Sequence, residues 1–242
     1  MKTIKSLSLA VAISLSAISL TSCGLNMNNL AKSVKETGRS ETKVYVYDSS
    51  KISELDIAAG VNVTYNVVDS AASTTVTIET DEAMMPHVVA ELSGNELCIY
   101  RKSDVSNSNI DINVKVTGPS LSSWEMSSGS RLSVNGTVAT SAKATIDISS
   151  GASAKFTSVK ASKLSIGAAS GSVVNVAEFN GGKLSADAST GAIAAIDGIR
   201  GASVSADAST GATIRLNGWA SDTDFDTSSG GSINSSRLKL TR

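Results

Sequence analysis

The sequence predicts an all-β protein, specifically a parallel β-solenoid (β-helix) with coils of about 20 residues, and three observations support this fold class. A triplet of small residues that ends in glycine recurs at nearly equal distances. Apolar and polar residues alternate on both sides of each such glycine. Proline occurs only twice and aromatic residues make up 4% of the chain, so small and β-branched side chains must fill the core, which suits a narrow stack of coils.

The recurring triplet defines the length of one coil. Its six occurrences are Ser127-Ser128-Gly129, Ser149-Ser150-Gly151, Ala169-Ser170-Gly171, Ser189-Thr190-Gly191, Ser209-Thr210-Gly211 and Ser228-Ser229-Gly230. The glycines are 22, 20, 20, 20 and 19 residues apart, and a repeat of this period indicates a solenoid. Glycine readily adopts the positive φ that a tight corner requires, so each triplet is predicted to join two short strands.

The residues around each corner glycine predict the core. Positions five and three before the glycine are mostly apolar, from Trp124/Met126 to Phe225/Thr227, as are positions three and five after it, from Leu132/Val134 to Ile214/Leu216. Such alternation indicates strands whose every second side chain points inward. A third apolar position follows eight residues after the glycine, at Val159, Phe179, Ile199 and Trp219. We therefore expect three short β faces per coil, with Trp219 inside.

The chain before this regular repeat is expected to form less regular coils. The same inward spacing surrounds Gly60, with Leu55 and Ile57 before it and Val63 and Tyr65 after it. The 69 residues from Gly60 to Gly129 correspond to about three longer coils. Within them, strands are expected at 74–80, 96–100 and 110–117, and 44–47 is expected to cap or edge the first coil.

The first 22 residues predict an export signal. Lys2 and Lys5 precede an apolar stretch, 7–20, which is too short for a comfortable membrane span. The following Leu20-Thr21-Ser22-Cys23 resembles a bacterial lipobox, in which Cys23 is acylated and becomes the mature N-terminus. Because two or more acyl chains anchor a protein stably, we expect a lipid-anchored envelope protein, located at the outer membrane.

These features divide the chain into four segments: a signal peptide (1–22), a lipidated N-terminus and flexible tether (23–43), irregular N-terminal coils (44–123) and regular coils with the C-terminal end (124–242). The net charge is −1, which provides no basic footprint for nucleic acid. His87 is the only histidine and follows Pro86 in a predicted turn. We therefore predict no catalytic residues and no cofactor.

A row of acidic residues is the one candidate site. Four residues before each corner glycine, between two inward positions, a side chain must point outward. The acidic residues at this position are Asp56, Glu125, Asp147, Asp187, Asp207 and Asp226, which we call the acidic row; Gly167 interrupts it. In-register coils would place neighbouring carboxylates about 5 Å apart. Three interpretations are open. The row binds Ca²⁺, because this ion takes several oxygen ligands; or it binds a basic or polyhydroxylated partner; or its carboxylates simply splay into solvent.

Three features together resemble the head GIN domain family: Ala59-Gly60-Val61-Asn62-Val63-Thr64-Tyr65, the later Leu92-Ser93-Gly94-Asn95-Glu96-Leu97 and the repeated Ser-Ser-Gly coils. The family is described as auto-transporter adhesins and is common among lipoproteins of Bacteroidota. The resemblance covers about residues 52–236, with Gly-Val-Asn where the family name records Gly-Ile-Asn. It implies a right-handed parallel β-helix-like fold without established catalytic residues.

Three functions follow as hypotheses. The first is a non-catalytic binding or adhesion module that displays a polar solenoid face to a glycan or an envelope protein. The second is a polysaccharide-active enzyme, because parallel β-helices host lyases and hydrolases, although Arg131, Arg200 and Arg215 are scattered in the sequence. The third is a structural or stress-related envelope protein. Open strand edges at the ends of a solenoid also favour self-association.

Overall fold

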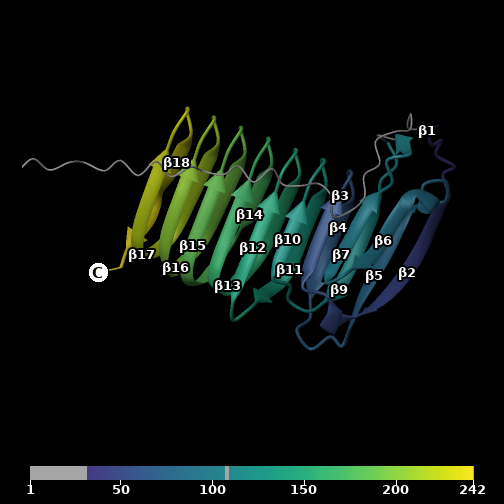
Figure 1. Ribbon diagram of the computed structural model, residues 1–242, viewed down its shortest axis with the longest axis horizontal. Helices are drawn as coiled ribbons and strands as arrows, with labels where there is room; N and C mark the ends of the chain where they lie inside the picture. The colour runs from purple at the N-terminus through teal and green to yellow at the C-terminus, as the bar shows by residue number, and fades with distance from the viewer. Residues whose placement is uncertain (1–31, 107–108, 242) are drawn as a thin grey trace, which may run out of the picture.

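The protein is an elongated parallel β-solenoid, as predicted (Figure 1). The computed structural model describes residues 32–106 and 109–241, so the predicted signal peptide and Cys23 lie outside the described residues. Within the described part, no helix has the length and apolar character needed to cross a membrane.

A sixteen-stranded sheet winds along the molecule, and a two-stranded sheet joins β1 to β8. Two short 3₁₀ helices occupy Ser49–Lys51 and Met85–His87. The strands, in chain order, are β1 (Lys32–Ser33), β2 (Ser40–Asp48), β3 (Glu54–Ala58), β4 (Asn62–Val67), β5 (Ser73–Asp81), β6 (Val88–Ser93), β7 (Glu96–Arg101), β8 (Val105–Ser106), β9 (Asn113–Gly118), β10 (Ser123–Met126), β11 (Arg131–Ala139), β12 (Lys143–Ile148), β13 (Ser153–Ala168), β14 (Val173–Val176), β15 (Phe179–Ala188), β16 (Ile193–Ala208), β17 (Thr213–Thr227) and β18 (Ser232–Leu240).

The predicted corners are tight turns with two left-handed residues. At one of them, Ser150 and Gly151 have φ values of 52° and 72°, and the amide of Ala152 donates to the carbonyl of Ser149 at 3.0 Å. Positive φ at both central positions, closed by this bond, is typical of a type I′ turn. The turns also bond to one another, because the Gly151 amide donates to the carbonyl of Ser170 on the next coil at 3.0 Å. The corners therefore form a bonded ridge along the solenoid.

The core contains the inward rows that the alternation predicted. All the predicted inward residues from Trp124 to Leu216 are buried. Large rings fill the core where the regular coils begin: Trp124 contacts Tyr65 and Phe156 edge-to-face, with centroids 5.0 and 5.3 Å away. Further along, the core narrows to alanines such as Ala186 and Ala206, both nearly inaccessible to solvent. A narrow core explains how a chain so poor in aromatic residues folds.

The stacking order of the N-terminal coils differs from the expected one. The coil formed by β3 and β4 pairs directly with the coil of β10 and β11, so that Leu55 lies opposite Trp124. The intervening chain does not form three successive coils. Instead it folds back, and β7 and β9 pair with the other edges of β3 and β4. A parallel strand can be paired along both edges, so the sequence period does not fix which coil lies beside which.

Antiparallel strands close the N-terminal end. β2 pairs with β5 and β5 with β9, while β6 pairs with β7, and β2 is the outermost strand (Figure 1). The expected strand at 44–47 lies within β2 at the outer edge of this end, but β5 and β9 separate it from the first coil, which β3 and β4 form. Part of the predicted flexible tether, which was expected to end at residue 43, is bound to the solenoid. β1 pairs with β8, and the Asp81 carboxylate accepts hydrogen bonds from the amides of Thr37 and Gly38 at 2.9 Å.

The last complete coil contains a one-residue slip that the sequence spacing missed. Ile199 pairs with Gly218 and Arg200 with Trp219. Trp219 was expected inside the solenoid, but its side chain is 51% exposed and lies 5.2 Å below the Lys239 ammonium. Phe225 and Thr227, also predicted inward, are exposed, because β18 pairs with β17 only as far as Ala220 and no other strand of the described residues covers the rest.

Candidate functional site

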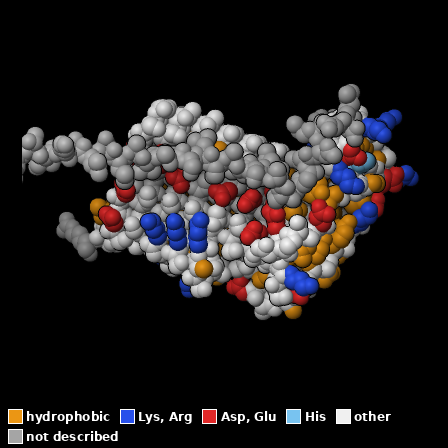
Figure 2. Space-filling view, in the orientation of Figure 1, with side chains coloured by type: hydrophobic (Ala, Val, Ile, Leu, Met, Phe, Trp, Pro, Cys, Tyr) orange, Lys and Arg blue, Asp and Glu red, His pale blue; other side chains and the backbone are white. Residues whose placement is uncertain are grey.

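The acidic row lies outward and in register, on the strands that precede the corners. Asp56 pairs with Glu125, which pairs with Asp147, and further along Asp187, Asp207 and Asp226 are opposite one another. Adjacent strands are about 4.8 Å apart, so the backbones that carry neighbouring carboxylates of the row have this separation. Figure 2 shows acidic side chains spread along this face of the molecule.

Gly167 interrupts the acidic row near its centre. Gly167 is the partner of both Asp147 and Asp187. A Cβ atom added at Gly167 would collide with the Asp147 carboxylate, so the Asp147 side chain leans into the space above the glycine. The gap in the row is therefore occupied by a neighbouring carboxylate.

A row of lysines runs beside the acidic row and offsets part of its charge. Lys143, Lys163 and Lys183, which we call the lysine row, are in register on three successive coils. Residues Thr145, Ser165 and Ser185 form an outward hydroxyl row between the two. Figure 2 shows basic side chains beside the acidic ones on this face. Together these outward rows form one charged surface, which we call the acidic face.

Burial and mutual repulsion raise the pKa of several carboxyls on the acidic face. For Asp56, burial and then the charges of Glu96 and Glu125 raise the pKa from 3.8 to about 7. Burial likewise raises the pKa of Asp147 and Asp187, while Lys143 and Lys163, respectively, oppose this rise. The N-terminal end of the acidic row is therefore partly protonated near neutral pH.

The acidic face offers a poor set of ligands for calcium at this end. Among the described residues, one group of three side chains brings metal-ligating atoms within 4.8 Å of one another: Asp56, Glu96 and Cys98. Calcium prefers six to eight oxygen ligands, whereas sulfur suits softer metals. Calcium binding elsewhere along the row, at Asp187, Asp207 and Asp226, stays a prediction.

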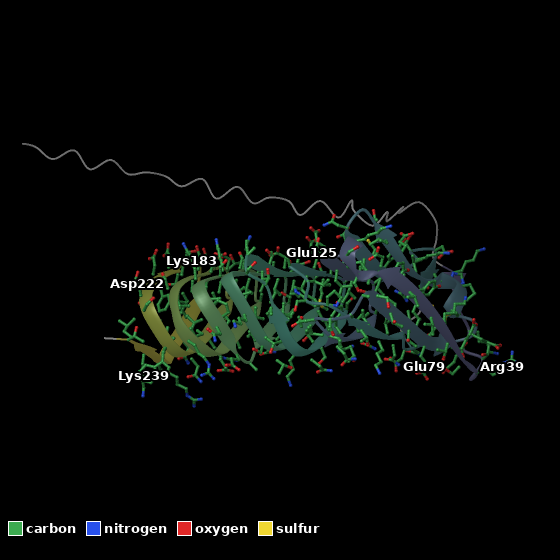
Figure 3. The ribbon with its side chains drawn as sticks, turned by 90° about the horizontal axis from the view of Figure 1, so that it is seen from below. Arg39, Glu79, Glu125, Lys183, Asp222 and Lys239 are labelled. Atoms are coloured by element: carbon green, nitrogen blue, oxygen red, sulfur yellow. The ribbon has the colours of Figure 1, made fainter. Side chains whose placement is uncertain are left out.

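A shallow groove on the opposite face was not predicted. It has a volume of about 770 Å³ and crosses five adjacent strands, β5, β9, β4, β11 and β13. Figure 3 shows Glu79, at the edge of the groove, on the side of the solenoid opposite Glu125, Lys183 and Asp222. We call this site the basic groove; its polar lining consists of Asn62, Thr64, Thr77, Glu79, Asn113, Lys115, Arg131, Ser133, Ser153 and Lys155.

The polar lining of the basic groove is arranged in two rows that cross the strands. One row contains Asn113, Asn62, Arg131 and Ser153, and the other contains Lys115, Thr64, Ser133 and Lys155. Asn62 Nδ2 lies 3.5 Å from Asn113 Oδ1, while Asn62 Oδ1 is buried and has no hydrogen-bond partner among the described residues. The rows therefore present cations, amides and hydroxyls together, at strand spacing.

The sequence contained a signal for part of this groove. The outward positions two and four residues after the corner glycine are polar at Asn62/Thr64, Arg131/Ser133 and Ser153/Lys155, just as the position four residues before it is acidic. The contributions of β5 and β9 carried no such signal, because these strands reach the groove through the unpredicted fold-back. Of the scattered arginines, Arg131 lines the groove and Arg200 forms an ion pair with Glu178 at 2.7 Å.

Stacked parallel coils with bonded corners and two outward faces of different charge define a β-solenoid that displays its polar surface. The chain belongs to the head GIN domain family, since the family model described as "Putative auto-transporter adhesin, head GIN domain" matches residues 53–199. None of the curated proteins is significantly similar to it in sequence.

Solved structures with the same architecture are available for comparison. A protein described as a "putative adhesin" from Parabacteroides merdae is 17% identical, with a TM-score of 0.51 over 88% of this chain and 100% of that one. Another with the same description, from Bacteroides fragilis, is 13% identical, with a TM-score of 0.54 over 83% of this chain and 97% of that one. At these identities the similarity shows a shared fold.

Proposed function

We propose that this protein is a non-catalytic binding module of the cell envelope, which holds a glycan or an envelope protein in the basic groove. The observation that carries the proposal is the groove itself: a preformed concave site lined by two rows of outward polar side chains. The family's description as adhesins supports a binding role. The acidic face is the second surface available to a partner.

The rigidity of the groove favours binding. Its floor strand β4 is hydrogen-bonded on both edges, to β9 and to β11, so the side chains lie on a fixed framework. Binding to a preorganised site avoids the entropic cost of ordering the protein. Because the floor's backbone groups are already paired, a ligand must be recognised by side chains.

The composition of the groove does not favour hydrolysis of a polysaccharide. Glycoside hydrolases typically use two carboxyl groups that flank the scissile bond. Of the described residues that line the groove, Glu79 is the only one with a carboxyl group. The acidic face has several carboxyls, but they lie on the opposite side of the solenoid.

The proposal includes attachment of the module to the outer membrane through acylated Cys23, with the solenoid held away from the lipid by the segment that follows. Incorporation of labelled palmitate into the intact protein, and its loss in Cys23→Ser, is the expected result. Release of the Cys23→Ser protein from the membrane fraction should accompany this loss. An unlabelled intact protein would contradict the anchor.

A matched pair of variants tests the groove as the binding site. Lipid-free protein (residues 24–242) would be screened against immobilised glycans and an extract of envelope proteins. Ser133→Trp places a large side chain in the groove, and Ser185→Trp makes the same change at a half-buried outward position of the acidic face. We expect Ser133→Trp to abolish capture of the retained ligand and Ser185→Trp to preserve it. The opposite pattern would place the site on the acidic face.

A further inference from the structure

Three cations that line the basic groove have no partner of opposite charge within residues 32–106 and 109–241. Lys115, Arg131 and Lys155 are exposed, on β9, β11 and β13. None of them takes part in the ion pairs found among the described residues. The lining's single acid, Glu79, belongs to β5 at the edge of the groove. The groove therefore has excess positive charge in a protein whose overall charge is −1.

The three cations are spread along the groove and not clustered at one point. Strands β9, β4, β11 and β13 are consecutive neighbours in the sheet. With about 4.8 Å between strands, the backbones that carry Lys115 and Lys155 are about 14 Å apart, and that of Arg131 lies between them. A ligand that satisfies all three must therefore carry several anionic groups along its length.

Hydrogen-bonding groups fill the intervals between the cations. Thr64 and Ser133 separate Lys115 from Lys155 in one row, and Asn62 precedes Arg131 in the other. The amide and hydroxyl groups of these side chains can exchange hydrogen bonds with the hydroxyl groups of a ligand.

We infer that the basic groove binds an acidic polysaccharide, with its carboxylate or sulfate groups on Lys115, Arg131 and Lys155 and its hydroxyls on Asn62, Thr64 and Ser133. This inference rests on the proposed function and names the class of its ligand. The guanidinium fork of Arg131 suits a planar carboxylate or a sulfate, and the two ammonium groups serve as point charges.

Two observations favour a polysaccharide over an acidic peptide. A peptide that binds to a sheet commonly adds a strand to an open edge, but the floor strand β4 is paired on both edges. The hydroxyl and amide groups between the cations also match a ligand with many hydroxyls. The acidic face on the other side would repel a polyanion there and favour its approach to the groove.

The test measures binding of lipid-free protein (residues 24–242) to polygalacturonate, dextran sulfate, neutral dextran and polyglutamate by biolayer interferometry. We expect binding to at least one of the two acidic polysaccharides, and none to neutral dextran. Affinity should fall as salt rises from 50 to 500 mM, because salt screens exposed charges.

Two triple variants with the same change in charge localise the site. In the groove variant, Lys115→Gln, Arg131→Gln and Lys155→Gln are combined. The control combines Lys143→Gln, Lys163→Gln and Lys183→Gln, which removes the lysine row from the acidic face. We expect affinity for the acidic polysaccharide to fall at least tenfold in the groove variant and to stay within twofold in the control. Equal melting temperatures would show that both variants fold.

Several results would overturn the inference. Equal losses in the two variants, or no loss in either, would mean that the groove cations do not hold the polyanion. Equal or tighter groove-dependent binding of polyglutamate would identify a peptide as the ligand class. If no acidic polysaccharide binds while Ser133→Trp still abolishes capture of a neutral glycan or a protein, this inference fails and the proposed function stands.

Discussion

Replacement of Asp56 by asparagine tests whether the acidic face limits stability above neutral pH. Asp56 is flanked by Glu125 on the neighbouring coil and lies near Glu96. Burial and these two charges raise the pKa of Asp56 from 3.8 to about 7. The folded protein thus binds a proton more tightly than the unfolded chain does. Stability from this proton is fully present below pH 3.8 and is lost as the pH rises to about 7.

The magnitude follows from the size of this rise. The pKa of Asp56 differs by about three between the folded and unfolded states. At about 1.36 kcal/mol for each pKa unit, Asp56 can change the free energy of unfolding by at most about 4 kcal/mol. Because Asp56 keeps some contact with solvent, screening reduces this figure, and we expect a free energy of unfolding about 2 kcal/mol smaller at pH 8 than at pH 4 from Asp56 alone. Asp56→Asn cannot ionise and should remove this loss.

Urea unfolding of wild-type and Asp56→Asn proteins at pH 4 and pH 8 measures the effect. Asp56→Asn is expected to be about 2 kcal/mol more stable than wild type at pH 8 and nearly equal to it at pH 4. Asp226→Asn, at the exposed end of the same row, makes the same change in charge and should show little difference at either pH. If Asp56→Asn is no more stable than wild type at pH 8, the argument from burial and repulsion is wrong.

Three further predictions concern the core, the corners and the N-terminal segment. Trp124→Ala should lower the free energy of unfolding by about 3 to 5 kcal/mol. Trp124→Phe should lower it much less, because the buried indole N–H has no hydrogen-bond partner in the described part of the chain. Equal losses for the two variants in urea titrations would contradict this. Thr190→Asn should raise the stability by about 0.5 to 1 kcal/mol, since a β-branched residue at φ 51° is strained and asparagine tolerates this region; an unchanged or lower urea midpoint would refute it. Asp81→Ala should speed hydrogen exchange at the amides of Thr37 and Gly38 by about tenfold or more, whereas exchange in the core strand β16 should not change; unaltered exchange at both amides would show that Asp81 does not hold this segment.

The sequence was sufficient to predict the regular part of the solenoid, because a strict repeat encodes it. Each glycine marks a corner, and alternation on either side assigns the inward and outward rows. The acidic row lies in register for the same reason. Trp219 was misplaced because counting from the glycine assumes coils of equal length, and the coil that ends at Gly230 is one residue short.

The basic groove shows what the repeat could not predict. Lys115 and Glu79 reach the groove only because β9 pairs with β4 and β5 pairs with β9. The period of a sequence sets the length of a coil, but either edge of a parallel strand can accept the next partner, so the order of stacking depends on tertiary packing. The polar pattern at 62–64 and 131–133 was visible in the sequence. That these residues line a groove could not be predicted, because the groove also needs β9 beside them.

The central claim is that the basic groove is the binding site, and the dissociation constants of Ser133→Trp and Ser185→Trp for the captured ligand test it most directly. Both substitutions add the same volume at half-buried outward serines, on opposite faces of the solenoid. If the basic groove is the binding site, Ser133→Trp weakens binding at least tenfold, while Ser185→Trp binds as tightly as wild type. A dissociation constant unchanged by Ser133→Trp would contradict the claim.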